Sequence, residues 1–88
     1  MIEIKPCVSE QVWGYGYNEK TQTLALQFVS RKGGQRGPGS VYHYANVTPL
    51  MFGALEATPS VGKWFAAILK NRADEFPYTK QPETEQSE

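Results

Sequence analysis

The sequence has little of the chemistry that builds disulfides, metal sites or membrane spans. It contains one cysteine, Cys7, and one histidine, His43. A lone cysteine cannot form an internal disulfide and is typical of a reducing compartment, so we expect a cytoplasmic protein. Two soft ligands are too few for a zinc site built by one chain. The longest apolar run, Trp64 to Leu69, is far shorter than the ~20 residues of a membrane helix.

Residue patterns typical of catalysis are equally scarce. His43 has no Asp or Glu near it in the sequence to orient its imidazole, and Cys7 has no companion group to activate its thiol. The acids that precede the C-terminal segment show no paired spacing. We therefore expect no catalytic residues, no metal and no cofactor, and a function in binding instead of catalysis.

The composition is that of one small globular domain. The chain has 88 residues, 40% of them hydrophobic and 20% charged, which suits a single domain with a thin core. Five Tyr, four Phe and two Trp must supply much of that core. We expect the domain to occupy residues 1–80, with its core at about 9–78. Residues 81–88 contain no apolar side chain and are predicted to form a disordered acidic tail.

A net charge of zero conceals a strong asymmetry. Between Lys20 and Arg72 the chain carries seven bases and the single acid Glu56, which gives a net charge of +6. The last eight residues carry three glutamates and no base, which gives −3. A basic body with an acidic tail is typical of a protein with a polyanionic partner, although both features also occur simply to maintain solubility.

The first half of the chain has the alternating pattern of β-strands. Residues 2–5 predict a short edge strand. In the strand predicted at 12–17, alternation places the three aromatic rings on one face and Val12 with two glycines on the other. Residues 24–29 and 41–44 supply the second and third strands of a meander.

The second half predicts two helices. Thr48 is a suitable N-cap for a first helix that has proline at its first position and runs to about Ala57. Ser60 caps a second helix, whose apolar residues form an amphipathic stripe: Val61, Trp64, Phe65, Ile68 and Leu69. The prediction is an α+β fold, a small antiparallel meander sheet of three or four strands followed by two short helices packed on one face.

Residues 30–40 separate the second and third predicted strands. They include four glycines, one proline and three bases, and no apolar side chain apart from the proline. Hairpin loops mostly have about 2–5 residues, so a segment of this length predicts a flexible basic loop, ordered on binding or simply solvated.

Several short motifs, in order, resemble the KTSC domain family. They are Gly16-Tyr17-Asn18, Leu24-x-Leu26-x-Phe28, Val41-Tyr42-His43-Tyr44, Val47-x-Pro49, Leu55-x-Ala57-x-x-Ser60-x-Gly62-Lys63-x-Phe65 and Ile68-x-Lys70. The resemblance covers about residues 9–78. This family takes its name from the C-terminus of some lysyl-tRNA synthetases and also occurs as small bacterial or phage proteins. It implies RNA binding and no catalytic residues, and a short glycine turn where this chain has residues 30–40.

The candidate binding residues are aromatic and basic. Tyr42, Tyr44 and Tyr15 could stack on unpaired bases, or pack as core beneath the helices. The bases that could neutralise phosphates are Arg31, Lys32, Arg36, Lys63, Lys70 and Arg72. The start of the second helix, at Ser60, Gly62 and Lys63, could hold an anion, or be an ordinary capped helix.

These residues favour a non-catalytic module that binds RNA or single-stranded nucleic acid through an aromatic sheet face and a basic, glycine-rich loop. The alternative is a protein-interaction domain, or a phage-type accessory or inhibitor protein, whose aromatic face is a contact patch. Capture of a small phosphorylated ligand at the second helix is a third possibility. A thin core with spare aromatic residues is compatible with a monomer or a homodimer.

Overall fold

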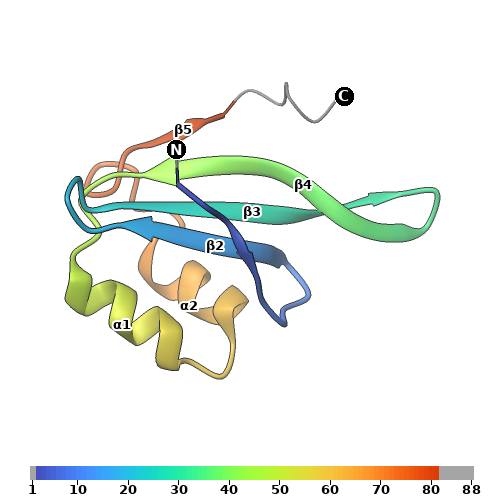
Figure 1. Ribbon diagram of the computed structural model, residues 1–88, viewed down its shortest axis with the longest axis horizontal. Helices are drawn as coiled ribbons and strands as arrows, with labels where there is room; N and C mark the ends of the chain where they lie inside the picture. Colours follow the sequence, from blue (N-terminus) through green and yellow to red (C-terminus); the bar gives the residue numbers. More distant parts are fainter. Residues whose placement is uncertain (1, 82–88) are drawn as a thin grey trace.

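The strands form one antiparallel sheet in which spatial order follows chain order. The computed structural model describes residues 2–81, and the sheet order is β1-β2-β3-β4-β5 (Figure 1). All four strand pairs are antiparallel, so the predicted α+β class and meander are confirmed. The elements are β1 (Lys5–Pro6), β2 (Val12–Asn18), β3 (Thr23–Lys32), β4 (Gln35–Tyr44), α1 (Pro49–Ala57), α2 (Val61–Ile68) and β5 (Tyr78–Lys80).

The sheet has five strands, one more than the largest number predicted. The edge strand expected at residues 2–5 is present as β1, shifted to Lys5–Pro6. The last strand, β5, was missed because three residues after a proline are too few to show alternation. It forms because the chain returns from α2 to the free edge of β4, where the Ala45 N–H donates to the Pro77 carbonyl at 2.9 Å.

The prediction of a flexible loop at residues 30–40 is wrong. Strands β3 and β4 continue through this segment, pairing Ser30 with Gly37 and Lys32 with Gln35. The turn between them is only Gly33-Gly34, and both residues have positive φ, 59° and 79°, as a two-residue hairpin turn requires. The ribbon formed by residues 30–40 projects beyond the rest of the sheet (Figure 1) and does not pack against the core. Its strands therefore need no apolar alternation, and their composition resembles that of a loop.

A β-bulge in β2 makes the predicted assignment of its side chains to the two faces of the sheet wrong. Val12 pairs with Phe28 and Gly14 pairs with Gln27, so one extra residue, Trp13, lies between these two pairs. A bulge reverses the alternation from that point onward. Val12 and the tyrosines of β2 therefore share the face that carries the helices, instead of lying on opposite faces.

Both helices begin at the predicted caps. The Thr48 hydroxyl accepts from the Met51 N–H at 3.2 Å, and the Ser60 hydroxyl accepts from the Lys63 N–H at 3.3 Å. Both helices lie on one face of the sheet, as predicted (Figure 1). Within residues 2–81, neither helix is long or apolar enough to span a bilayer.

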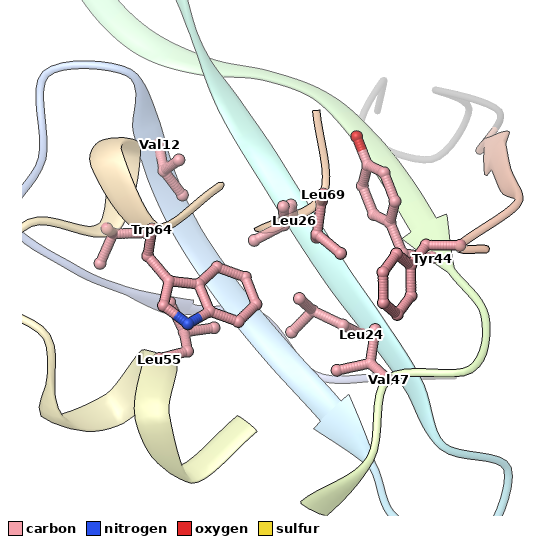
Figure 2. Close-up of a cluster of buried hydrophobic side chains, with 10 residues drawn as sticks. Val12, Leu24, Leu26, Tyr44, Val47, Leu55, Trp64 and Leu69 are labelled. Carbon is pink, nitrogen blue, oxygen red and sulfur yellow. The ribbon is translucent and has the colours of Figure 1, made fainter. Parts of the chain in front are cut away.

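The core lies between the helices and β2, β3 and β4. Figure 2 shows the Trp64 indole lying over the sheet near Leu26 and Leu55. Burial of such side chains supplies most of the stabilisation of a small domain. The buried cluster comprises Val12, Leu24, Leu26, Tyr44, Val47, Leu55, Val61, Trp64, Leu69 and Phe76.

The N-terminal segment packs closely over the other face of the sheet. A methyl group added at Gly14 would lie 2.5 Å from the Lys5 carbonyl oxygen, and one at Gly16 would overlap the Glu3 carbonyl oxygen. Real Cβ atoms do not approach other atoms so closely, so the two glycines of β2 create the space in which residues 2–6 lie.

The structure describes only the first residue of the predicted C-terminal tail. The first residue of the predicted tail, Gln81, donates its backbone N–H to the Val41 carbonyl at 2.8 Å, next to β5. The rest of that tail, residues 82–88, lies outside the described residues.

Candidate nucleic-acid interface

An open groove lies on the helix face of the sheet. It has a volume of about 1030 Å³ and lies between the β3–β4 ribbon and the end of α2 with the turn that follows it. Aromatic rings form its floor and polar or basic groups its margins. Its aromatic and basic lining residues are Phe28, Tyr42, Tyr44, Phe65, Tyr78, Lys32 and Lys70.

The rings of the groove form a connected edge-to-face network. The Tyr42 ring centroid is 5.6 Å from that of Phe28 and 5.7 Å from that of Tyr78, at interplanar angles of 73° and 70°. Phe28 also contacts Phe65 on α2 at 5.3 Å. Such contacts hold ring orientations more firmly than burial alone. Tyr78 is 54% exposed, so part of its side chain is accessible from solvent.

The structure separates the three predicted stacking tyrosines. Tyr42 lines the groove and is half-buried. Tyr44 borders the groove but belongs to the core, with only 5% of its surface exposed. Tyr15 lies elsewhere, with its ring edge-to-face against Phe52 of α1 at 5.9 Å. Tyr78, which sequence reasoning missed, comes to the groove only because β5 pairs with β4. Its one sequence signal is an aromatic residue directly after Pro77.

Burial of Tyr44 gives the protein a specific alkaline sensitivity. Burial, with the nearby Tyr78 and Tyr42 hydroxyls, raises the pKa of Tyr44 from 10.0 to about 12. The unfolded chain therefore loses this proton first, and stability is retained below pH 10 and lost as pH rises from 10 through 12. Two pKa units correspond to roughly 2–3 kcal/mol. Tyr44→Phe should flatten this loss in urea denaturation curves measured across that interval.

The substitution Tyr78→Phe removes one of the two neighbouring hydroxyls that add to this pKa shift but leaves burial, its largest cause, in place, so it should flatten the loss much less than Tyr44→Phe does. A Tyr44→Phe protein that loses stability as steeply as the native chain above pH 10 would contradict the assignment to Tyr44.

The three bases of the ribbon point in two directions. Lys32 lines the groove. Arg31 is one position away and pairs directly with Arg36 across the ribbon, so strand alternation places both on the other face. The Arg36 guanidinium lies 5.4 Å from the Trp13 ring centroid and donates a hydrogen bond to the Ser9 carbonyl. Arg36 therefore ties the ribbon to the segment before β2.

The bases of the helical half are also divided. Lys70, just after α2, lines the groove opposite the ribbon. Lys63 is exposed on α2 and does not line the groove. Arg72 forms an exposed ion pair with Glu75 at 3.8 Å, a contact worth little in water. The groove thus has one lysine on each side, and the other four predicted bases do not line it.

The predicted anion site at the start of α2 is occupied by the chain's own groups. The Lys63 N–H is taken by the Ser60 hydroxyl at 3.3 Å. A methyl group placed on Gly62 would lie 3.0 Å from the side-chain oxygen of Gln11. Ser60, Gly62 and Lys63 do share one helical turn, but a neighbouring side chain covers it.

The two side chains considered for catalysis, His43 and Cys7, do not form a common site with other titratable groups. Burial lowers the pKa of His43, which lies on the face of β4 opposite Tyr42 and Tyr44. Burial raises the pKa of Cys7, an effect that the charge of Arg36 partly offsets, so the thiol form is favoured. Across residues 2–81, no three His, Cys, Asp or Glu side chains gather as a metal site would require.

The fold defines a small α+β domain with a five-stranded antiparallel meander and two helices covering one face. The model of the KTSC domain family matches residues 8–72, and the chain belongs to this family. The crystal structure of a KTSC domain protein from Yersinia pestis superimposes with a TM-score of 0.73 at 22% identity, covering 93% of this chain and all of the other. A search of curated proteins gives no match.

The strand pairing removes the apparent departure from the family pattern at residues 30–40. The resemblance implied a short glycine turn between the second and third strands of the family pattern. The turn Gly33-Gly34 is that short turn. The strands on either side of it run to Lys32 and from Gln35.

Proposed function

We propose that this KTSC domain is a non-catalytic module that binds single-stranded nucleic acid, RNA in the first place, in the aromatic groove. The observation that carries the proposal is the combination of an accessible aromatic floor with a lysine on either side. Bases splayed from a single strand can stack on aromatic rings, while lysines neutralise the phosphates that connect them.

The shape of the groove favours single strands over duplexes. Its aromatic floor lies between the projecting ribbon and the turn after α2, so a ligand must present unpaired bases to reach the rings. In a duplex the base faces are stacked on one another and cannot contact a side-chain ring. Tyr42 and Tyr78 are the rings proposed to stack, since Tyr44 is held in the core.

Charge supports binding without sequence specificity. Lys32 and Lys70 flank the rings, and Arg31 lies nearby on the ribbon. Contacts of this kind to phosphates fix position and affinity, and carry no information about the base sequence.

The salt dependence of binding tests the two flanking lysines. Fluorescence anisotropy with a short single-stranded RNA should give binding that weakens as salt rises. Each neutralised phosphate contributes about −0.7 to the slope of log K against log salt for single strands. The Lys32→Ala, Lys70→Ala protein should therefore show a slope shallower by roughly 1.4, with its unfolding free energy unchanged because both side chains lie at the surface.

A matched protein carries Lys5→Ala and Lys20→Ala, which changes the net charge equally but away from the groove. An equal reduction of the slope in both proteins would mean that only net charge matters and would sink the role of the groove. A duplex of the same length should bind more weakly than the single strand to the native chain.

A protein-interaction role is the second candidate, and one feature of α1 favours it. Leu50 is 85% exposed, and Gly53, Ala54 and Ala57 are exposed at helical spacing from it. An apolar helix surface of this kind suits contact with another protein. A protein partner would persist in a pull-down after nuclease treatment, whereas a nucleic-acid partner would be lost.

A further inference from the structure

The two rings that the groove offers to a ligand are nearly perpendicular to each other. Tyr42 is half-buried, and Tyr78 is the more exposed of the two. Their ring centroids are 5.7 Å apart and their planes meet at 70°. A base that stacks on a ring lies parallel to it. Bases stacked on Tyr42 and Tyr78 would therefore lie in planes that also differ by about 70°.

The contacts around these two rings hold the angle between them. The Tyr78 ring centroid is 5.4 Å from that of the buried Tyr44, and the Tyr42 centroid is 5.6 Å from that of Phe28. Tyr44 and Phe28 both contact Phe65 of α2, at 5.9 Å and 5.3 Å. Ring contacts of this kind favour particular orientations. A ligand must therefore conform to the angle between Tyr42 and Tyr78.

The protein's own rings leave the stacking positions in the groove open. Within residues 2–81, the ring pair that stacks in parallel is Tyr17 with Phe52, at 9°, and neither residue lines the groove. The ring pairs of the groove meet at angles between 42° and 73°. No ring among the described residues therefore lies parallel on Tyr42 or Tyr78, where a base is proposed to stack.

A lysine outside the groove lining lies beside both rings. Strand β5 pairs Lys80 with Tyr42, and Tyr78 with Tyr44. Side chains two positions apart on a strand lie on one face of the sheet, as do side chains directly opposite on neighbouring strands. Lys80 is thus a neighbour of both Tyr42 and Tyr78, and it is exposed. Its flexible ammonium group is suited to neutralise a phosphate that joins two bases stacked on these rings.

Perpendicular rings discriminate between single strands by how easily neighbouring bases separate. Bases that stack on each other are parallel, so a step that bridges two rings at 70° must lose its own base–base stack. Runs of adenine stack strongly, whereas runs of uracil stack weakly and bend easily. Preferences of this origin depend on stacking strength and backbone flexibility, and require no hydrogen bond to a base edge.

We propose that the groove binds a kinked step of pyrimidine-rich single-stranded nucleic acid, with one base on Tyr42, the next on Tyr78 and the connecting phosphate beside Lys80. This inference rests on the proposed function and adds to it a preference for uridine runs over adenosine runs. Phosphate contacts at Lys32 and Lys70 carry no information about the base. The preference therefore comes from the angle between the two rings.

The test compares uridine and adenosine oligomers of equal length in anisotropy titrations at low salt. The native chain should bind the uridine oligomer at least roughly fivefold more tightly, a ratio that corresponds to the lower end of the energy of one base stack. Tyr78→Leu leaves one ring and no kink, so the ratio should fall to about one. The matched variant, Tyr78→Phe, keeps the ring and should keep the native ratio.

The salt dependence of uridine binding tests Lys80 separately. Lys80→Ala should make the slope of log K against log salt shallower by roughly 0.7, the contribution of one phosphate on a single strand. Lys20→Ala makes the same charge change in the exposed turn between β2 and β3, outside the groove lining, and should leave the slope close to the native one. Equal slopes in these two variants would overturn the phosphate contact at Lys80.

The outcomes separate the kinked step from the function on which it rests. Equal binding of the two oligomers by the native chain, or tighter binding of the adenosine oligomer, would overturn the kinked step and leave the proposed function standing. A uridine preference that persists in Tyr78→Leu would assign the discrimination to base-edge contacts and overturn the kinked step as well. Failure of the native chain to bind either oligomer at low salt would overturn the proposed function itself, and the kinked step with it.

Discussion

Gly16→Ala is expected to lower the free energy of unfolding by at least about 2 kcal/mol, since overpacking of a closely packed site typically costs 1–3 kcal/mol. The added methyl group would overlap the Glu3 carbonyl oxygen and lie 2.8 Å from the Ile2 side chain. Neither can yield without moving the N-terminal segment away from the sheet. For a domain of this size such a loss is a large fraction of the total stability. Urea denaturation monitored by tryptophan fluorescence measures it directly.

The same substitution at Gly53 is the matched control. Gly53 lies within α1, and a methyl group there would meet nothing within 4 Å. Gly53→Ala should therefore stabilise the protein by about 0.5–1 kcal/mol, because alanine is the better helix former. If Gly16→Ala left the unfolding free energy within about 0.5 kcal/mol of the native value, the overpacking expected from close contact with the N-terminal segment would be refuted.

Replacing Tyr42 and Tyr78 together by leucine is expected to abolish most of the proposed affinity for single-stranded RNA. Each base stacked on an aromatic ring contributes about 1–3 kcal/mol, which corresponds to roughly five- to 150-fold in the dissociation constant. Leucine keeps much of the apolar volume that Tyr42 packs against Phe28, so the fold should persist. Anisotropy titrations at low salt would show a loss of roughly 25-fold or more if both rings stack on bases.

Tyr15→Leu provides the comparison for this pair. Tyr15 lies on the same face of the sheet but contacts Phe52 of α1 and does not line the groove. It should leave RNA affinity unchanged. If Tyr15→Leu weakened binding as much as the groove pair, the aromatic contacts would lie elsewhere on the sheet, and the groove would not be the binding site.

The helices and the central strands were predictable because their signals are local. The caps at Thr48 and Ser60 lie within three residues of the N–H groups they satisfy. The amphipathic stripe of α2 is likewise set by spacing within one helix, and Trp64 is buried where that stripe placed it. Alternation in β3 similarly placed Leu24 and Leu26 on the buried face.

The ribbon and the faces of β2 were mispredicted because their signals are not local. An isolated ribbon has no buried face, so residues 30–40 have the composition of a loop although most of them are paired. The single extra residue at Trp13 reverses the faces of β2, and only its register with β3 reveals that. The candidate site changed accordingly, with Tyr15 placed outside the groove and Tyr78 added.

The sequence alone determined the fold class, the family resemblance and the chemical character of the surface, since periodicity, capping and composition are properties of neighbouring residues. Only the tertiary structure decided which rings share a groove and which bases flank it. Phe28, Phe65 and Tyr78 come from three different elements. They meet because long-range strand pairing and helix packing bring distant segments together, and no local pattern specifies that register.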